Sequence, residues 1–241
     1  MKGKTKKFIV IVFLALIASK FAYVNPQEIN YQSKVNLIRE DVKALENSDY
    51  DTNTLVENEE LESTSKGVGV LEIPNSGYST VIMQGDDNKY YLNHDEDGNK
   101  KSDGVPFLDY RVNIDTSRKL IIYGHSSRYS DMPFNTLENY YNEDYYNKHK
   151  IIILKTKKEK YKYEIFSVYT ETSDWGYTKV GFKTLKEYLD HINELASRSI
   201  YKSDIKLTEK DKILILQTCS TNKDYKKYKK KYLLVIGRKV D

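Results

Sequence analysis

Short apolar segments recur along residues 67–240 and constrain the fold more than any other feature of this 241-residue chain. Val, Ile, Leu, Tyr and Phe cluster in runs of strand length, and the turn residues Pro74 to Gly77 divide the first run in two. The predicted strands lie within 67–85, 104–112, 119–125, 150–156, 162–172, 212–218 and 232–240. About eight short strands with few helices favour a mostly β fold that closes into a β-barrel.

Three segments have helical periodicity instead. Residues 27–48 form a predicted amphipathic N-terminal helix, and residues 135–148 a short polar-aromatic helix. Residues 184–199, between the sixth and seventh strands, begin with a capping box made by Thr184 and Glu187. Their apolar stripe, which indicates core packing, consists of Leu185, Leu189, Ile192 and Leu195.

The N-terminus places basic residues ahead of an apolar run, residues 8–18. Continued to Val24 with Lys20 at an interface, a helix would reach about 25 Å, against roughly 30 Å of hydrocarbon. We expect a membrane anchor with the following chain outside, and a cleaved signal peptide is the alternative. The predicted organisation is an anchor or signal segment at 1–25, a helical linker at 26–66 and a catalytic barrel domain at 67–241.

Charge and motif content exclude several classes of function. The net charge is +4, and lysines alternate with carboxylates almost everywhere, so no nucleic-acid partner is expected. The exception is NKDYKKYKKKY, residues 222–232, which contains six lysines. No calcium-loop spacing, phosphate-binding loop or CxxC pair occurs, so we expect no metal and no cofactor.

Cys219 is the only cysteine, and it ends the apolar segment ILILQTC. In an exported chain a single cysteine cannot form an internal disulfide. Two interpretations stay open: an inert buried thiol, or a nucleophile whose thiolate is supported by a nearby base or cation.

The four histidines differ in their suitability as that base. His94 and His149 lie in polar surroundings, and His191 lies off the apolar stripe of its helix, where we expect it to face solvent. His125 ends the strand KLIIYGH directly after Gly124. His125 and Cys219 therefore both follow apolar strands, and two such ends can meet at one end of a barrel. Spacing alone leaves this pairing open.

Several segments together resemble the sortases. YGHSS (123–127), LQTC (216–219) and YLLVIGR (232–238) are similar to the family's His motif, TLxTC motif and last strand. DNKYYLNHD (87–95), GVPFLDYR (104–111), MPFNTLENY (132–140) and the 184–199 helix resemble class B. The resemblance spans residues 68–238 and implies an eight-stranded sortase-type barrel, with an N-terminal helix and a helix between strands six and seven.

The resemblance also implies an activity: a membrane-tethered cysteine transpeptidase on the outer face of a Gram-positive cell. Cys219 would cleave a C-terminal sorting motif after Thr through a thioacyl intermediate, with His125 as acid and then base. The partners would be sorting-signal-bearing surface proteins and an amine of peptidoglycan or of its lipid-linked precursor. Two alternatives stay open: a cysteine peptidase that only hydrolyses, and a catalytically weak sortase-like binding protein.

One family residue is missing. Sortases carry an Arg at the start of the last strand, and the matching position here is Tyr232, preceded by Lys231. Arg238 lies six residues further on, about 20 Å along an extended strand. Lys231 and Tyr232 are therefore the candidates for stabilising substrate or oxyanion. The substrate-binding residues that the resemblance implies are Asn88, Leu92, Tyr177 and Thr218.

Overall fold

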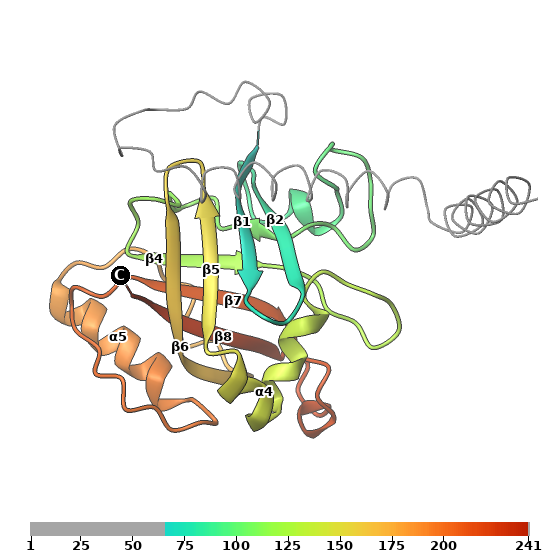
Figure 1. The fold of residues 1–241 in the computed structure, drawn as a ribbon. Coiled ribbons are helices and arrows are strands. Elements are labelled where there is room, and N and C mark those ends of the chain that lie inside the picture. Colours follow the sequence, from blue (N-terminus) through green and yellow to red (C-terminus); the bar gives the residue numbers. More distant parts are fainter. Residues whose placement is uncertain (1–65, 241) are drawn as a thin grey trace, which may run out of the picture. The chain divides into compact units, whose positions relative to one another are not determined.

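A computed structural model describes residues 66–240 of the chain (Figure 1). The predicted helix at 27–48 and the apolar run at 8–18 lie outside these residues. Between residues 66 and 240, no helix has the length and apolar character needed to cross a membrane.

Eight strands form a closed barrel in the order β1-β2-β3-β4-β7-β8-β6-β5. Pairing of β1 with β5 closes it, so no strand has a free edge. The strands are β1 (Gly67–Ile73), β2 (Tyr78–Gln84), β3 (Phe107–Leu108), β4 (Lys119–Tyr123), β5 (Ile151–Thr156), β6 (Lys160–Glu171), β7 (Ile213–Cys219) and β8 (Tyr232–Val240). The predicted mostly β, eight-stranded barrel is confirmed.

Two of the strand pairings are parallel, β2 with β3 and β4 with β7. The β4–β7 pairing joins segments about 90 residues apart in the sequence and aligns Tyr123 with Gln217. β8 then pairs antiparallel with β7 and aligns Tyr232 with Cys219. These two registers determine which side chains gather at the carboxyl ends of β4 and β7.

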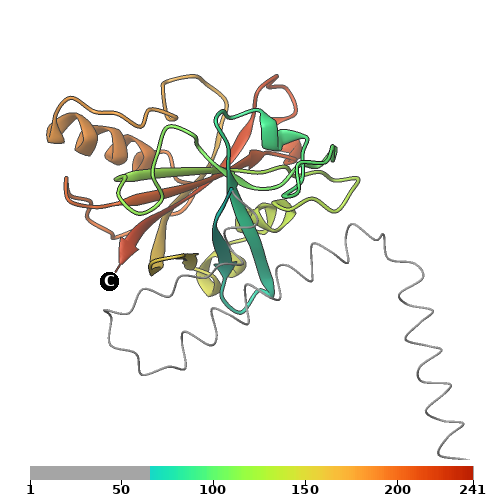
Figure 2. The same ribbon diagram turned by 90° about the horizontal axis from the view of Figure 1, so that it is seen from above.

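The barrel has an inner and an outer apolar cluster because strand side chains alternate between its two faces. The inner cluster takes residues from all eight strands, including Leu120, Leu214 and Val235. The outer cluster takes the alternate residues, including Ile121 and Ile215, and packs them against helix α5 (Leu185–Ser197). Figures 1 and 2 show α5 lying along the outside of the barrel.

Helix α5 confirms the prediction for residues 184–199, and its N-cap Thr184 accepts a hydrogen bond from the Glu187 amide at 3.1 Å. Its buried face is rotated from the predicted stripe, because Leu185 is 53% exposed whereas Tyr188 is buried. The predicted helix at 135–148 is instead two elements, the 3₁₀ helix η2 (Asn135–Tyr141) and α4 (Glu143–Lys148). Asn142 adopts extended geometry between them and caps α4.

Candidate active site

His125 and Cys219 occupy equivalent positions at the ends of neighbouring parallel strands. Each lies two residues beyond the aligned pair Tyr123 and Gln217. The ladder continues past Tyr123, because the Gly124 amide donates to the Gln217 carbonyl at 3.1 Å. The structure therefore brings the two residues to one end of the barrel, although 94 positions separate them in the sequence.

The two residues also share one face of the sheet. Ile121 and Ile215 belong to the outer cluster, and a period of two carries that face to His125 and Cys219. On β8, Leu234 belongs to the same cluster and Tyr232 packs against it. The alternation along β7 and β8 thus assigns Cys219 and Tyr232 to the same side, and we expect the His125 imidazole there because it follows β4 by two residues.

The His125 imidazole is held by a backbone carbonyl. Its Nε2 lies 2.8 Å from the Leu92 oxygen, which requires Nε2 to donate its proton. The His125 carbonyl accepts from the Phe134 amide at 2.9 Å. A Cβ at Gly124 would lie 2.6 Å from the Phe134 ring, so only glycine allows this close approach.

Cys219 is exposed, and the Ser126 hydroxyl donates to its carbonyl oxygen. This bond ties the residue after His125 to the backbone of the cysteine. Desolvation raises the pKa of the Cys219 thiol above its ordinary value, and the Glu138 carboxylate raises it further. The Lys231 ammonium acts in the opposite direction and lowers that pKa. Desolvation and Glu138 therefore favour the neutral thiol, and Lys231 is the side chain that favours the thiolate.

The Lys231–Tyr232 step lies directly across from the cysteine. The Ser220 amide donates to the Lys231 carbonyl at 3.0 Å, which continues the β7–β8 ladder past Cys219. Tyr232 is half-buried beside the outer cluster. A cation and a phenol thus border the thiol at the point where the sequence lacks an arginine.

Asn88 and Leu92 lie in the connection between β2 and β3. The Asn88 side-chain oxygen accepts from the Tyr110 amide at 3.0 Å, which braces the turn after β3. The Leu92 side chain is 37% exposed, while its carbonyl holds His125. Leu92 therefore both faces solvent at the site and positions the imidazole, and the second contact has no signature in the sequence.

Tyr177 and Thr218 are both buried. Tyr177 is 6% exposed within the outer cluster, and burial raises the pKa of its phenol above the usual range, with Tyr232 as the next contribution. Thr218 is 2% exposed, and its hydroxyl finds no partner among the described residues. The neighbouring Gln217 side-chain oxygen is likewise unpaired there. Two unpaired polar atoms thus lie immediately before the cysteine.

Two cationic side chains, Lys119 and Arg111, bind backbone carbonyls of the loop that carries Tyr177, residues 172–184. The Lys119 ammonium donates to the carbonyls of Tyr177 and Lys179, the latter at 2.9 Å. The Arg111 guanidinium donates to the Thr178 carbonyl at 2.9 Å. Three consecutive carbonyls are therefore fixed by side chains from the β3–β4 region.

Arg111 is itself anchored by a fully buried carboxylate. Its Nε and Nη2 donate to Asp109 at 2.9 and 2.6 Å, and the Tyr123 hydroxyl donates to the same carboxylate at 2.8 Å. The pKa of Asp109 is lowered despite its burial, because these hydrogen bonds stabilise the anion. The network connects the end of β4, next to His125, with the Tyr177 loop.

The prediction that His191 faces solvent is wrong. Its side chain is buried, and its Nε2 lies 2.6 Å from the Lys119 ammonium. The ring packs between Trp175 and Phe182, with centroid distances of 5.1 and 4.9 Å. The buried face of α5, which contains Tyr188, His191, Ile192 and Leu195, is shifted by about one residue from the predicted apolar stripe.

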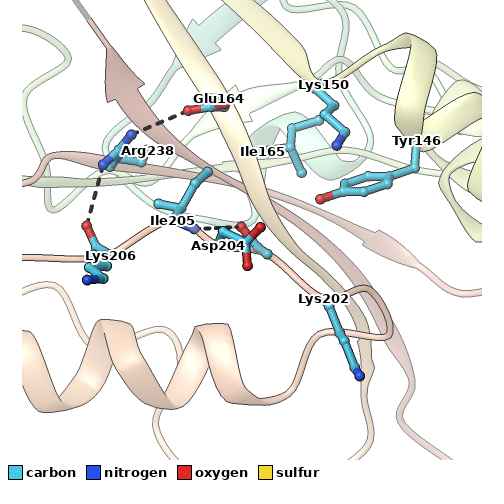
Figure 3. A pocket seen from close by; sticks show the side chains of 10 residues that line it. Tyr146, Lys150, Glu164, Ile165, Lys202, Asp204, Ile205, Lys206 and Arg238 are labelled. Carbon is cyan, nitrogen blue, oxygen red and sulfur yellow. Dashed lines mark hydrogen bonds and ion pairs between the residues drawn. The ribbon is translucent and has the colours of Figure 1, made fainter.

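Arg238 lies six residues along β8 from Tyr232 and lines the pocket shown in Figure 3. It pairs with Glu164 at 3.3 Å on the wall of a cavity of about 530 Å³, at the β8 end remote from Tyr232. The rest of the lining is mixed, with three lysines, one aspartate and several uncharged side chains. Arg238 thus forms its ion pair with a residue of β6 and does not reach Cys219.

No group of three or more His, Cys, Asp or Glu side chains within residues 66–240 is arranged to hold a metal ion. Acid–base and nucleophilic groups are the chemistry present at this site. Thiol, imidazole and hydrogen-bond donors on one face can support attack on a carbonyl carbon and protonation of a leaving group.

The sortase domain family matches residues 71–240. Sortase B of Listeria monocytogenes is 34% identical over 205 residues, covering 82% of this chain and 83% of the relative. The Staphylococcus aureus sortase B–substrate complex is similar with a TM-score of 0.77 at 26% identity, covering 89% of this chain and 96% of that chain. Clostridium perfringens sortase B gives 0.69 at 27% identity, covering 76% and 98%. The matched range includes both strand ends described above.

Proposed function

The chain belongs to the sortase family, in its class B, and is a cysteine transpeptidase; from this premise we propose that Cys219 is its nucleophile and His125 its general acid and base. Sortases act at the surface of Gram-positive bacteria on proteins with a sorting signal and on peptidoglycan amines. The observation that carries the assignment is the β4–β7 register, in which the two residues are equivalent on parallel neighbours.

In the first step, the Cys219 thiolate attacks the threonine carbonyl of the sorting motif. A carbon–sulfur bond forms, the carbon–nitrogen bond breaks, and the His125 imidazolium gives a proton to the leaving amine. In the second step, an acceptor amine attacks the thioester and expels the thiolate. Neutral His125 takes the proton of the incoming amine, so the enzyme regains its starting state without an external energy source.

The raised thiol pKa sets the population of the reactive form. Although the residue is exposed, neighbouring atoms partly desolvate its thiol, which raises the pKa and favours the neutral form over the thiolate. We infer that Lys231 supports the thiolate and that Tyr232 donates a hydrogen bond to the developing oxyanion. Support comes from the Lys231 contribution to the thiol pKa and from the alignment of Tyr232 with Cys219.

The substrate residues are inferred from the same end of the barrel. Asn88 and Leu92 would border the sorting motif on the β4 side, and Tyr177 on the side of α5. The Thr218 hydroxyl, which has no partner among the described residues, would help to position the backbone next to Cys219 when the sorting motif binds. Because Leu92 is exposed, we infer that its side chain contacts the sorting motif directly. Because Tyr177 is buried, we infer that it lies beneath the motif and supports the surface on which the motif binds.

Attachment to the membrane through residues 1–25 is a further part of the proposal. Basic residues ahead of the apolar run at 8–18 favour an N-terminus inside the cell and a catalytic domain outside. Membrane fractionation of the full chain and of a chain lacking residues 2–25 tests it. The shortened chain is expected in the soluble fraction, and its retention in the membrane would contradict an anchor.

The test of the catalytic assignment is a peptide-library cleavage assay with intact-mass detection of the protein. The parent chain should gain the mass of an acyl fragment, and Cys219→Ala should gain none and cleave nothing. His125→Gln is expected to lower cleavage at least about 100-fold, since general acid catalysis contributes 10²–10⁴-fold. His149→Gln is the matched control, because the His149 ring contacts the Pro74 carbonyl, away from the ends of β4 and β7 that carry His125 and Cys219.

Adding a primary amine distinguishes transfer from hydrolysis. A transpeptidase forms an amide with the acceptor at the expense of the free acid. Cleavage by Cys219→Ala equal to that of the parent would remove the assignment of the nucleophile. An unchanged product mixture with amine present would indicate a peptidase.

A further inference from the structure

The segment between β7 and β8 concentrates positive charge beside the candidate nucleophile. Residues 222–232 contain six lysines and one carboxylate, Asp224, so the segment carries +5. The whole chain carries only +4. The remainder of the protein is therefore close to neutral, and the charge of this segment is a local feature.

None of these lysines is neutralised within the described part of the chain. No carboxylate there forms an ion pair with any of them, and the one recorded contact places Lys227 over the Tyr228 ring at 5.1 Å. Lys223, Lys226, Lys227, Lys229 and Lys230 are exposed. Six like charges within eleven residues repel one another, and a bound anion would relieve this repulsion. The segment is therefore suited to bind an anion.

The segment is nonetheless folded. The Asn222 side chain accepts from the Asp224 amide at 2.9 Å and starts the 3₁₀ turn η3 (Lys223–Tyr225). The Tyr228 amide donates to the Tyr225 carbonyl at 3.0 Å. The Thr221 amide donates to the Glu138 carboxylate at 2.9 Å, which fixes the start of the segment on η2. The lysines are therefore presented by an ordered support.

The position of the segment relates it to the second substrate. It begins three residues after Cys219 and ends at Tyr232, the residue aligned with Cys219 across β7 and β8. Asn88 and Leu92 lie beyond β4, on the other side of β7 in the strand order. In the strand order, Asn88 and Leu92 thus lie on the β4 side of the cysteine and the lysines on the β8 side.

We propose that residues 222–231 bind a phosphate or pyrophosphate group carried by the amine acceptor. This inference rests on the proposed function. Lysines act as mobile point charges suited to a multiply charged phosphate, and the segment has no arginine to form a bidentate pair with a carboxylate. Binding of the anion would hold the acceptor amine near the thioester and favour transfer over hydrolysis.

The test compares two full-length variants in neutral detergent that each lose four positive charges. The first is Lys226→Gln, Lys227→Gln, Lys229→Gln and Lys230→Gln. The matched control changes exposed lysines elsewhere: Lys148→Gln, Lys157→Gln, Lys162→Gln and Lys210→Gln. Lys231 stays unchanged in both because of its proximity to the thiol. Circular dichroism verifies that both variants are folded.

The binding probe is inorganic pyrophosphate, titrated calorimetrically at low and high NaCl. The parent and the control are expected to bind it, more weakly at high salt, and the segment variant at least about ten-fold more weakly. The transfer probes are triglycine and Gly-Gly-phosphoserine. The parent and the control should prefer the phosphorylated acceptor, and the segment variant should lose this preference.

Three outcomes overturn the inference: no pyrophosphate binding by the parent, equal weakening in both variants, or equal use of the two acceptors by the parent. A fourth uses anionic and neutral lipid vesicles. Loss of anionic-vesicle binding by the segment variant, with acceptor preference intact, would assign the lysines to the membrane surface. Failure of the parent to form any acyl adduct would instead contradict the proposed function, and the pyrophosphate titration would still decide this inference.

Discussion

The ammonium of Lys119 lies 2.6 Å from Nε2 of His191, and both side chains are buried between the barrel and α5. Burial, followed by the nearby Arg111 charge, lowers the pKa of Lys119 to about 7. Burial, followed by the Lys119 charge, lowers the pKa of His191 to about 3. His191 is therefore the neutral acceptor, while Lys119 fixes the loop that carries Tyr177.

Substituting Lys119 by Met should change how stability depends on pH. In the unfolded chain lysine titrates near 10.5, so between pH 7 and 9 the unfolded state binds more protons at this residue. Its contribution to the free energy of unfolding thus rises with pH in this window, by up to about 1 kcal/mol per pH unit. Urea unfolding of the parent should show this rise, and Lys119→Met should lack it.

Lys186→Met is the control for that experiment, because Lys186 is exposed and pairs with Asp190 on α5. Its pH dependence should match that of the parent. A Lys119→Met protein whose stability follows pH as steeply as the parent would show that this ammonium stays charged throughout. The predicted window would then be wrong.

Gly124→Ala should damage both the fold and the position of His125, the proposed acid–base group. The added methyl would lie 2.6–2.9 Å from three atoms of the buried Phe134 ring, which must move. Overpacking of this kind costs about 2 kcal/mol. Because His125 follows directly, donor cleavage should fall by more than the fraction of unfolded protein explains. Thermal unfolding and kcat/KM test this, and Gly181→Ala, which has open space, is the control.

The thiol should respond in opposite directions to its two charged neighbours. Lys231→Gln removes the charge that lowers the Cys219 pKa, so the pKa should rise. Glu138→Gln removes one that raises it, so the pKa should fall. The pH dependence of Cys219 alkylation by iodoacetamide measures both values. Shifts of the same sign, or none, would contradict the assigned positions of these side chains.

Tyr232→Arg should increase turnover. An arginine at the start of β8 would place a guanidinium where Tyr232 aligns with Cys219, and a cation stabilises an oxyanion more than a neutral phenol does. We expect about a ten-fold gain in kcat for donor cleavage, and a loss with Tyr232→Phe. If Tyr232→Phe retains the parent's kcat, the phenol hydroxyl has no part in the reaction.

Most of the barrel follows from local sequence. The strand segments and the helix at 184–199 could be predicted because apolar periodicity is a property of neighbouring residues. For the same reason, it could be predicted that His125 and Cys219 each follow an apolar strand. Phe107–Leu108 is shorter than predicted, because Pro106 precedes it and Asp109 begins a turn stabilised by Arg111. Asn142 divided the predicted second helix because its side chain caps α4.

The buried polar contacts could not be predicted in this way. Lys119 begins an apolar strand and resembles a solvent-facing flank, yet its partners lie 58 to 72 positions away. The Leu92 carbonyl that holds His125 is a backbone atom, which carries no residue-specific signal. Such contacts depend on tertiary packing, and the sequence pattern around each residue does not report it.

The parallel pairing of β4 with β7 brings the ends that carry His125 and Cys219 together through direct backbone hydrogen bonds between the two strands. The intervening chain crosses over once and returns, so its length does not enter the alignment of Tyr123 with Gln217. The β5–β6 hairpin completes the barrel and must stay, and Phe134 and Glu138 contact the two strand ends, but the loops that flank α5 can vary in length. A lineage could retarget such an enzyme to new cargo by changing these loops, leaving its bond-exchanging centre untouched.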